Sequence, residues 1–481
     1  MIDVFLDGVP IRGRSAALFD QFRAAIAEGR FRPGDQLPPS RDLATELGVA
    51  RSTIATVYAR LVGEGFAEGR VGDGTFVTDY HAGTNTRTHA HATTHPVRIA
   101  RRIPAWADTV TPPPGGWRVD LRTGRPDPSL FPVVDWRRCA TAALDRPPPG
   151  YGEPAGLPAL RHAIAAWVSR SRGVQATDDT VLITAGAQGA FDLLARTLTV
   201  AGDTVAVEDP GYAPTRQAFA QHGAKIAPIA VDADGIDVAR IPRSTRAVVV
   251  TPSHQAPTGV VMSGARRRQL LAIAHARDFM VIEDDYDTEY RYVERPLEPL
   301  HRLDTHGRVV YVGSFSKTLS PSLRLGFIVA PADLVAELTS VRRLSDGQPP
   351  HMTQATLAAF ISTGGFERHL RRTGRVYRGR REHLIAGLDR LRQNGTVQSF
   401  DPCPAGLHLT VQIPRRDQTA RVAERMQAAG VAILTTAEHQ VVDRALDLVI
   451  GFGLASIEQI DEALHALAIC QPRSGSSRTL D

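Results

Sequence analysis

The sequence predicts a multidomain protein in which a small helical domain ending in a β-hairpin precedes a large α/β domain with a mainly parallel sheet. Its 481 residues are too many for one ordinary domain. Helical periodicity fills residues 1–79, and apolar strand patterns alternate with helical ones over 118–471. Residues 80–117 are rich in Thr, His, Arg, Pro and Gly, as linkers are, and 472–481 are expected to form a disordered tail.

Composition narrows the class of protein without identifying it. The formal net charge of +5 is modest for this length and does not by itself indicate nucleic-acid binding. Cys139, Cys403 and Cys470 are far apart and are not at metal-ligand spacing, which favours a reducing compartment. No signal-peptide pattern and no apolar run of membrane-spanning length is present. We therefore expect a soluble, cytoplasmic protein that does not contact a membrane.

The first domain shows the pattern of a helix, a helix–turn–helix and a hairpin. Apolar residues at every fourth position predict the first helix: Leu18, Phe22 and Ile26. Ser40 is expected to cap a second helix, Gly48 to form the turn, and a third helix to begin at about Arg51. Residues 68–78 alternate around Asp73-Gly74, a strong hairpin signal. This order is typical of a winged helix-turn-helix.

Residues 37–77, LPPSRDLATELGVARSTIATVYARLVGEGFAEGRVGDGTFV, resemble the DNA-binding domain of GntR-type regulators. The resemblance implies double-stranded DNA as a partner, with the third helix entering the major groove. The residues it places against DNA are Arg41, Arg51, Ser52, Thr53 and Thr56 on the helices, and Arg70 and Gly72 in the wing. The alternative is a helical bundle with a solvated polar surface, since acidic residues slightly outnumber arginines over residues 1–80.

The linker contains four histidines that could suggest a metal site: His81, His89, His91 and His95. A tract of this composition is more often flexible and solvated than metal-binding. We expect no metal site.

The large domain is organised around residues 309–327, VVYVGSFSKTLSPSLRLGF. An apolar, β-branched run predicts a buried parallel strand, and a hydroxyl-rich loop with one lysine follows it. Lysine occurs only at Lys225 and Lys317, and every other basic side chain apart from histidine is arginine. A desolvated lysine can lose its proton and bond covalently to a carbonyl, which arginine cannot do. The alternative is a surface lysine in a turn.

The segment SFSKTLSPSLRLG (314–326) resembles the cofactor-lysine motif of fold-type I aminotransferases that use pyridoxal 5'-phosphate (PLP). The resemblance implies that Lys317 attaches PLP covalently, that Asp284 pairs with the pyridine nitrogen, and that Tyr212 stacks on the ring. Tyr286 would bind the ring hydroxyl, and Tyr151 would reach the phosphate bound by the partner subunit of a homodimer. The residues implied to bind the phosphate within the subunit are Ser314, Arg324, Ala187 and Gln188.

A GntR-like domain joined to an aminotransferase-like domain resembles the MocR/GabR group of transcriptional regulators. This implies a PLP-binding regulator in which a small-molecule effector, an amino compound or PLP itself, alters operator binding. The group carries an arginine that grips a substrate carboxylate two residues before Gly-Phe; here that position is Val449. Two alternatives remain: an aminotransferase with an appended DNA-binding domain, and a regulator whose large domain is only a dimerisation scaffold.

Overall fold

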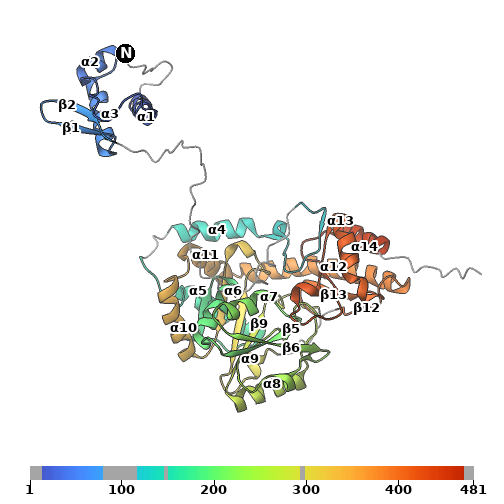
Figure 1. The fold of residues 1–481 in the computed structure, drawn as a ribbon. Helices are drawn as coiled ribbons and strands as arrows, with labels where there is room; N and C mark the ends of the chain where they lie inside the picture. The colour runs from blue at the N-terminus through green and yellow to red at the C-terminus, as the bar shows by residue number, and fades with distance from the viewer. Residues whose placement is uncertain (1–12, 80–115, 146–149, 293–297, 403, 471–481) are drawn as a thin grey trace, which may run out of the picture. The chain divides into compact units, whose positions relative to one another are not determined.

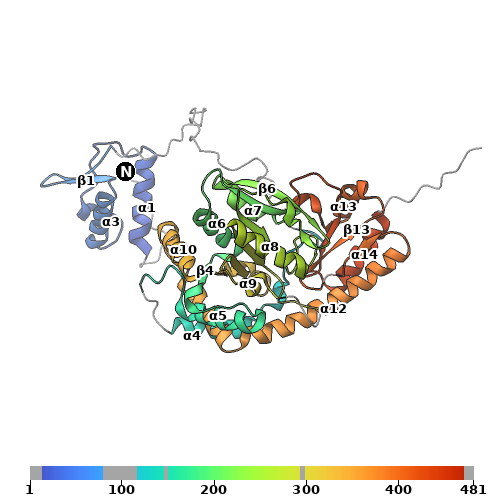
Figure 2. The same ribbon diagram turned by 90° about the horizontal axis from the view of Figure 1, so that it is seen from below.

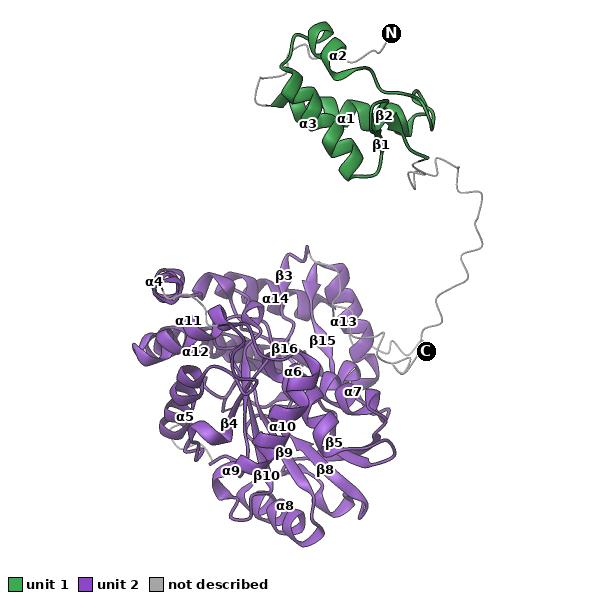
Figure 3. Ribbon diagram, turned by 90° about the vertical axis from the view of Figure 1, so that its left-hand side faces the viewer, with its two compact units in different colours: residues 1–100 green, residues 101–481 purple. Residues whose placement is uncertain are grey.

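The computed structural model describes residues 13–79, 116–145, 150–292, 298–402 and 404–470. The chain divides into two units, residues 1–100 and 101–481 (Figure 3). Most of the predicted linker, its four histidines, Cys403 and the predicted tail lie outside the described residues. Among the residues that are described, no helix combines the length and the apolar character needed to cross a membrane.

The first unit is a winged helix, as the sequence predicts (Figure 1). Its elements are α1 (Arg14–Ala27), α2 (Ser40–Glu46), α3 (Arg51–Gly63), β1 (Ala67–Arg70) and β2 (Gly74–Val77). The three helices bury an apolar core around Phe22, Ile54 and Leu61, and β1 pairs antiparallel with β2 to form the wing. The expected cap at Ser40 is wrong: Pro39 occupies the N-cap position, and Ser40 is the first helical residue.

The second unit contains a large, mostly parallel sheet (Figure 1). Its order is β4-β11-β10-β9-β8-β5-β6-β7, with β11 antiparallel to both neighbours and β7 antiparallel to β6. The strands are β4 (Val181–Thr184), β5 (Thr204–Asp209), β6 (Lys225–Asp232), β7 (Gly235–Ile236), β8 (Thr245–Val250), β9 (Met280–Asp285), β10 (Val309–Ser314) and β11 (Gly326–Val329). Apolar runs in the sequence predict six of these strands and miss β6 and β7; the runs are 181–184, 204–208, 246–252, 279–285, 309–314 and 326–330.

Helices cover the large sheet because its strands are apolar on both faces. They are α4 (Val133–Leu144), α5 (Pro158–Arg172), α6 (Gly186–Leu198), α7 (Ala213–Gln221), α8 (Gly264–Arg277), α9 (Leu300–Leu303), α10 (Ala332–Ser345) and α11 (His351–Ser362). Val310 and Val312 of β10 point into one core cluster, whereas Tyr311 points into another. The alternation shows that both faces of this strand are packed.

A smaller C-terminal sheet lies beyond the long helix α12 (Gly365–Gln393), which runs along the unit in Figure 2. Its order is β12-β13-β16-β15, from strands β12 (Ser399–Phe400), β13 (His408–Gln412), β15 (Leu434–Thr435) and β16 (Leu448–Gly451). Helices α13 (Thr419–Ala428) and α14 (Ile457–Cys470) belong to the same region, as does a short parallel pair of β3 (Val119–Asp120) with β14 (Val431–Ala432). Through β3, the start of the unit joins its C-terminal part.

Candidate cofactor and effector pocket

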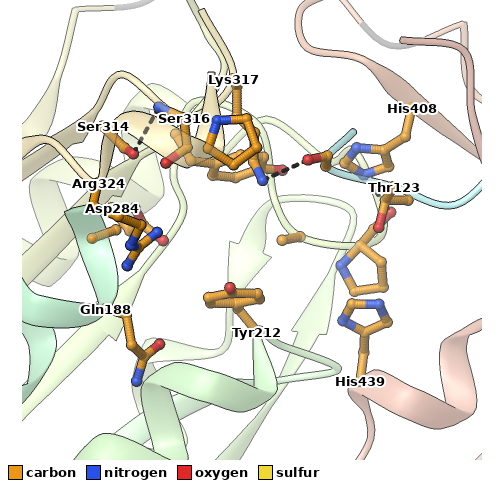
Figure 4. Close-up of a pocket in the computed structure, with 16 residues that line it drawn as sticks. Thr123, Gln188, Tyr212, Asp284, Ser314, Ser316, Lys317, Arg324, His408 and His439 are labelled. Carbon is orange, nitrogen blue, oxygen red and sulfur yellow. Dashed lines mark hydrogen bonds between the residues drawn. The ribbon is translucent and has the colours of Figure 1, made fainter. Parts of the chain in front are cut away.

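A cavity of about 260 Å³ lies where the parallel strands β5, β8, β9 and β10 end. Carboxyl ends of parallel strands commonly form the sites of α/β proteins, because the loops that follow them converge there. The cavity is lined by Thr123, Gly124, Ala187, Gln188, Tyr212, Ala256, Pro257, Asp284, Tyr286, Ser314, Ser316, Lys317, Pro321, Arg324, His408 and His439. All the predicted cofactor-binding residues except Tyr151 are therefore brought together (Figure 4).

Lys317 projects into the cavity from the loop that follows β10 (Figure 4). Its Nζ donates a hydrogen bond to the carbonyl oxygen of Gly124 at 2.7 Å. Burial lowers the pKa of Lys317, although the carboxylates of Asp287 and Asp284 partly oppose that change. A lowered pKa leaves more of the amine unprotonated near neutral pH, which is the reactive form toward a carbonyl.

Asp284, in β9, is a buried carboxyl with one oxygen that lacks a partner. Within the described residues, no group donates a hydrogen bond to its Oδ1. Burial raises the pKa of Asp284 to about 8, and the charges of Asp285 and Glu208 add to the rise. An unpaired buried carboxylate is costly, and a cationic N–H in the cavity would remove that cost. The site therefore fits the protonated pyridine nitrogen of PLP.

The opposite end of a PLP molecule requires a phosphate site, and Arg324 provides a guanidinium there. Its backbone is left-handed, with φ 50°, and its Nη2 donates to the carbonyl oxygen of Ala185 at 2.9 Å. Helix α6 begins at the next residue, Gly186, so its unpaired backbone N–H groups face the same region. Ser314 accepts a hydrogen bond from the backbone N–H of Ser316 at 3.2 Å.

The two predicted ring-contacting tyrosines both line the cavity, whereas Tyr151 does not. Tyr212 directly precedes α7 and is 43% exposed. The Tyr286 hydroxyl lies 3.3 Å from Nδ1 of His254, and the two rings stack at 5.7 Å. Tyr151 is fully exposed within the single chain and lies outside the lining of the cavity.

Sequence reasoning missed the wall opposite Asp284, where Thr123, His408 and His439 lie in Figure 4. Burial lowers the pKa of His408 to about 3 and that of His439 to about 4, so both rings are neutral at pH 7. His408 Nε2 lies 3.0 Å from the carbonyl oxygen of Pro257. Neither ring nitrogen of His439 has a hydrogen-bond partner in the described part of the chain. This wall therefore offers hydrogen bonds without positive charge.

Val449 lies in β16 of the small sheet and is not itself one of the residues that line the cavity. It pairs with Thr410 across β13 and β16, and paired residues of neighbouring strands point to the same face. Thr410 donates to the carbonyl oxygen of Pro257 at 2.6 Å, so this face of the sheet is turned toward the cavity. Val449 is completely buried. An apolar side chain thus occupies the position at which the resemblance places a carboxylate-binding arginine.

The residue after Lys317 connects the cofactor loop with α12. The carbonyl oxygen of Thr318 lies 2.6 Å from Nε2 of His369, in the first turns of α12. The hydroxyl of Tyr290 also donates to this oxygen, at 3.5 Å, and lies 3.2 Å from Oγ1 of Thr373. One peptide group is therefore held by two buried side chains.

The first unit presents its predicted DNA-contacting residues on its surface. Arg51 is the first residue of α3, and its Nε lies 3.5 Å from the hydroxyl oxygen of Ser40. Arg70 is in β1, where it forms an exposed ion pair with Glu68 at 2.8 Å. Of the seven predicted residues, Thr53 is half-buried and the other six are exposed. The exposed residues are Arg41, Arg51, Ser52, Thr56, Arg70 and Gly72.

Comparison with known protein families assigns the two units separately. Residues 14–77 match the gntR family of bacterial regulatory proteins, and residues 120–467 match the class I and II aminotransferases. Among solved structures, the kynurenine aminotransferase of Pyrococcus horikoshii, in a complex with PMP, superposes with a TM-score of 0.68 at 27% identity. The match covers 73% of this chain and 90% of that one.

Curated relatives match over both units. The probable rhizopine catabolism regulatory protein MocR of Rhizobium meliloti is 36% identical over 86% of this chain and 84% of its own length. The regulator TauR of Rhodobacter capsulatus is 36% identical over 85% of this chain and 86% of its own length. The pyridoxine biosynthesis regulator PdxR of Corynebacterium glutamicum is 34% identical over 92% of both chains.

A winged helix and a PLP-binding aminotransferase fold in one chain define a class of DNA-binding transcriptional regulators whose second domain has the fold of an enzyme. The chain belongs to that class, as a member of the MocR-type family of GntR regulators. Its large unit is a PLP-binding domain.

Proposed function

We propose that the cavity around Lys317 holds PLP as the sensing group of the regulator, and that an effector binding there alters the affinity of the winged helix for its operator. The observation that carries this proposal is that one cavity contains both the buried amine of Lys317, whose pKa is lowered, and the carboxyl oxygen of Asp284 that has no hydrogen-bond donor among the described residues. When bound, PLP supplies an aldehyde that reacts with amines and an electron-withdrawing ring.

Each lining residue has a proposed role toward this cofactor. The Lys317 amine would condense with its aldehyde carbon with loss of water, Asp284 would keep the pyridine nitrogen protonated, and Tyr286 would donate to the ring hydroxyl. Tyr212 covers one face of the ring. The phosphate is bound by Arg324, Ser314 and the start of α6 at Ala187 and Gln188.

The effector in this proposal is an amine without a conventionally clamped carboxylate, or PLP itself. Apart from its two neutral histidines, the basic side chains that line the cavity are Lys317 and Arg324, and both have roles toward the cofactor. Because Val449 stands where related proteins carry the carboxylate-binding arginine, a carboxylate bound there would be buried without a charged partner, which is costly. One relative is named as a regulator of pyridoxine biosynthesis, which favours PLP as the signal. The effector shifts DNA binding only as far as it prefers one conformation.

We further propose that the regulator acts as a cytoplasmic homodimer without sustained enzymatic turnover. Exposed Tyr151 then completes the partner's phosphate site. The functional domains run over 1–79 and 118–471. A transaminating enzyme with an appended DNA-binding domain is the second candidate, because an aromatic-amino-acid aminotransferase of Thermococcus litoralis is 28% identical over 73% of this chain. Val449 disfavours it.

The absorption spectrum of the purified protein tests the cofactor proposal, with Lys317→Ala as the control. We expect a visible band that the variant lacks, and a change in operator affinity when PLP or an amine is added to the wild type. If the protein already shows the band when it is purified, PLP is resident and the effector is an amine. If the band forms only when PLP is added, PLP itself is the effector. Failure to form the band at any PLP concentration would overturn the proposal. Steady turnover of an amino donor with a keto acid would instead establish the enzyme.

A further inference from the structure

Helix α12 carries a row of arginines on its exposed side. The row comprises Arg368, Arg371, Arg372, Arg375 and Arg378, all exposed. Positions three and four apart lie on one face of a helix, so Arg371, Arg375 and Arg378 form a continuous strip. Over the described ranges, Arg371 and Arg375 have no hydrogen bond or ion pair, and Arg378 donates to the carbonyl oxygen of Arg291 at 3.1 Å.

The strip borders a cavity of about 540 Å³, separate from the cofactor pocket. Four arginines line it: Arg291, Arg371, Arg375 and Arg378. The acid among its lining residues is Glu289, whose Oε2 is buried without a hydrogen-bond partner in the described chain. Burial raises the pKa of Glu289 to about 8, so this carboxyl is mostly neutral at pH 7 and does not cancel the arginines. Among the residues that the structure describes around this cavity, four arginines therefore face one carboxyl that is mostly neutral, and the lining carries a net positive charge.

A surface of this kind fits phosphate oxygens. Guanidinium groups bind them in pairs, and a protonated carboxyl can donate a further hydrogen bond. Arg368 and Arg372 donate to the carbonyl oxygens of Thr363 and Leu130, so the strip itself runs from Arg371 to Arg378. Over these seven residues the helix rises roughly 10 Å at about 1.5 Å per residue, a length over which one DNA strand presents about three phosphates at ~3.4 Å of helix axis each. A single small anion would not use the whole row.

We propose that the arginine strip of α12 contacts the phosphate backbone of the operator DNA, so that the aminotransferase-like unit is itself part of the DNA-binding surface. The polyanion that this family of proteins is known to meet is DNA. The described part of the first unit ends at residue 79 and that of the second begins at residue 116; a chain of that many residues can span up to about 3.4 Å per residue, which is enough for both units to contact one duplex. Backbone contacts add affinity without reading sequence.

The test uses the full chain with the double substitution Arg371→Gln/Arg375→Gln. Operator affinity is measured by fluorescence anisotropy across a series of salt concentrations. Each lost phosphate contact reduces the slope of log K against log[salt] by about 0.9, so we expect a reduction of nearly two for each α12 that contacts the duplex, and an affinity loss of about tenfold or more at low salt. Preference for operator over scrambled DNA should not change.

The matched control is Arg268→Gln/Arg343→Gln, which removes the same charge from exposed arginines of α8 and α10. An unchanged slope in the α12 variant, or an equal change in the control, would overturn the proposal. A further arm titrates inorganic pyrophosphate and follows the melting temperature. Stabilisation of the wild type that is lost in the α12 variant without any change in DNA binding would assign the cavity to free phosphate compounds and also overturn it. Retention of the PLP absorption band in the variant separates this test from the cofactor proposal.

Discussion

The amine of Lys317 and the carbonyl oxygen of Gly124 are 2.7 Å apart, although the two residues are 193 positions apart in the chain. Gly124 has φ +71°, and a Cβ built there would lie 2.7 Å from Nζ. The glycine therefore leaves the space that the lysine side chain occupies. It also ties the beginning of the large unit to the loop after β10.

Gly124→Ala should weaken PLP binding by about tenfold or more, because the added methyl group meets the Lys317 amine in a backbone conformation that alanine disfavours. PLP titration followed by absorbance measures the effect. Gly347→Ala is the matched control: its φ is +73°, but no atom lies within 4 Å of the added Cβ. Equal affinities of the two variants would show that the lysine does not need this space.

Val449→Arg should create a response to carboxylate-bearing amines. The arginine enters a fully buried position on the face turned toward the cavity, so the variant alone should melt several degrees lower. Amino acids should then restore its melting temperature and shift its absorption band, while the wild type responds little. Val449→Met, which is long but uncharged, should gain no such response. Tight binding of common amino acids by the wild type would contradict this explanation.

A mixing experiment tests the role of Tyr151 across subunits. Tyr151→Phe and Lys317→Ala should each weaken or abolish cofactor binding alone. A heterodimer of the two has one site with both defects and one with neither, since the intact Lys317 meets the intact Tyr151 of the other chain. We expect mixed chains to regain wild-type PLP affinity at up to half of the sites of each heterodimer. No recovery after confirmed subunit exchange would place Tyr151 outside the partner's site.

The pH dependence of stability should reflect the buried acids around the cavity. Burial raises the pKa of Asp284 to about 8 and that of Glu208 to about 7, above the ordinary values near 4. The folded state then binds protons more tightly than the unfolded state. The stabilisation is complete below pH 4 and is lost as pH rises to about 8, at about 1.4 kcal/mol per pH unit for each protonated group.

Urea unfolding of the cofactor-free protein at pH 6 and pH 8 measures this loss. Asp284→Asn should flatten the slope, whereas Asp333→Asn, at an exposed position of α10, should not. A free energy of unfolding that rises between these pH values would contradict the assigned direction.

Arg51→Ala should weaken operator binding by about 1–3 kcal/mol and relax sequence preference if the arginine reads a base. It is exposed at the first position of α3, the end that enters the major groove. Arg30→Ala removes the same charge from an arginine paired with Glu28 elsewhere in the unit and should change affinity little. Competition assays with operator and scrambled duplexes separate the two effects.

Local patterns predicted the central strands and the residues at their ends. Val309–Ser314 is a run of mostly β-branched residues, and a parallel sheet gathers the loops that follow such runs at one edge. Strand β6 was missed because its burial is mixed along its length. The N-cap of α2 is Pro39 and not the predicted Ser40, because Pro38 and Pro39 already fix the backbone that leads into the helix.

The wall formed by Thr123, His408 and His439 could not be predicted in the same way, because it joins segments with no shared motif. His408 gave a weak signal: in His408–Gln412 it alternates with apolar Leu409, so one face of this strand is not core. His439 gave none. Its place in the cavity follows from the packing of the C-terminal region, which includes the hydrogen bond from the backbone N–H of Gly211 to its carbonyl oxygen at 2.9 Å.

The carbonyl of Thr318 connects the loop that carries Lys317 with helix α12. The same peptide follows the cofactor lysine and is held by His369 of α12 and by Tyr290, which also lines the cationic cavity. An effector that moves the backbone after Lys317 would strain these two hydrogen bonds or move α12 with them. If α12 contacts the operator, occupancy of the pocket and affinity for DNA are coupled within the large unit itself. Such coupling would persist in a variant with extra residues inserted between residues 79 and 116. This distinguishes it from a signal that is transmitted through that segment.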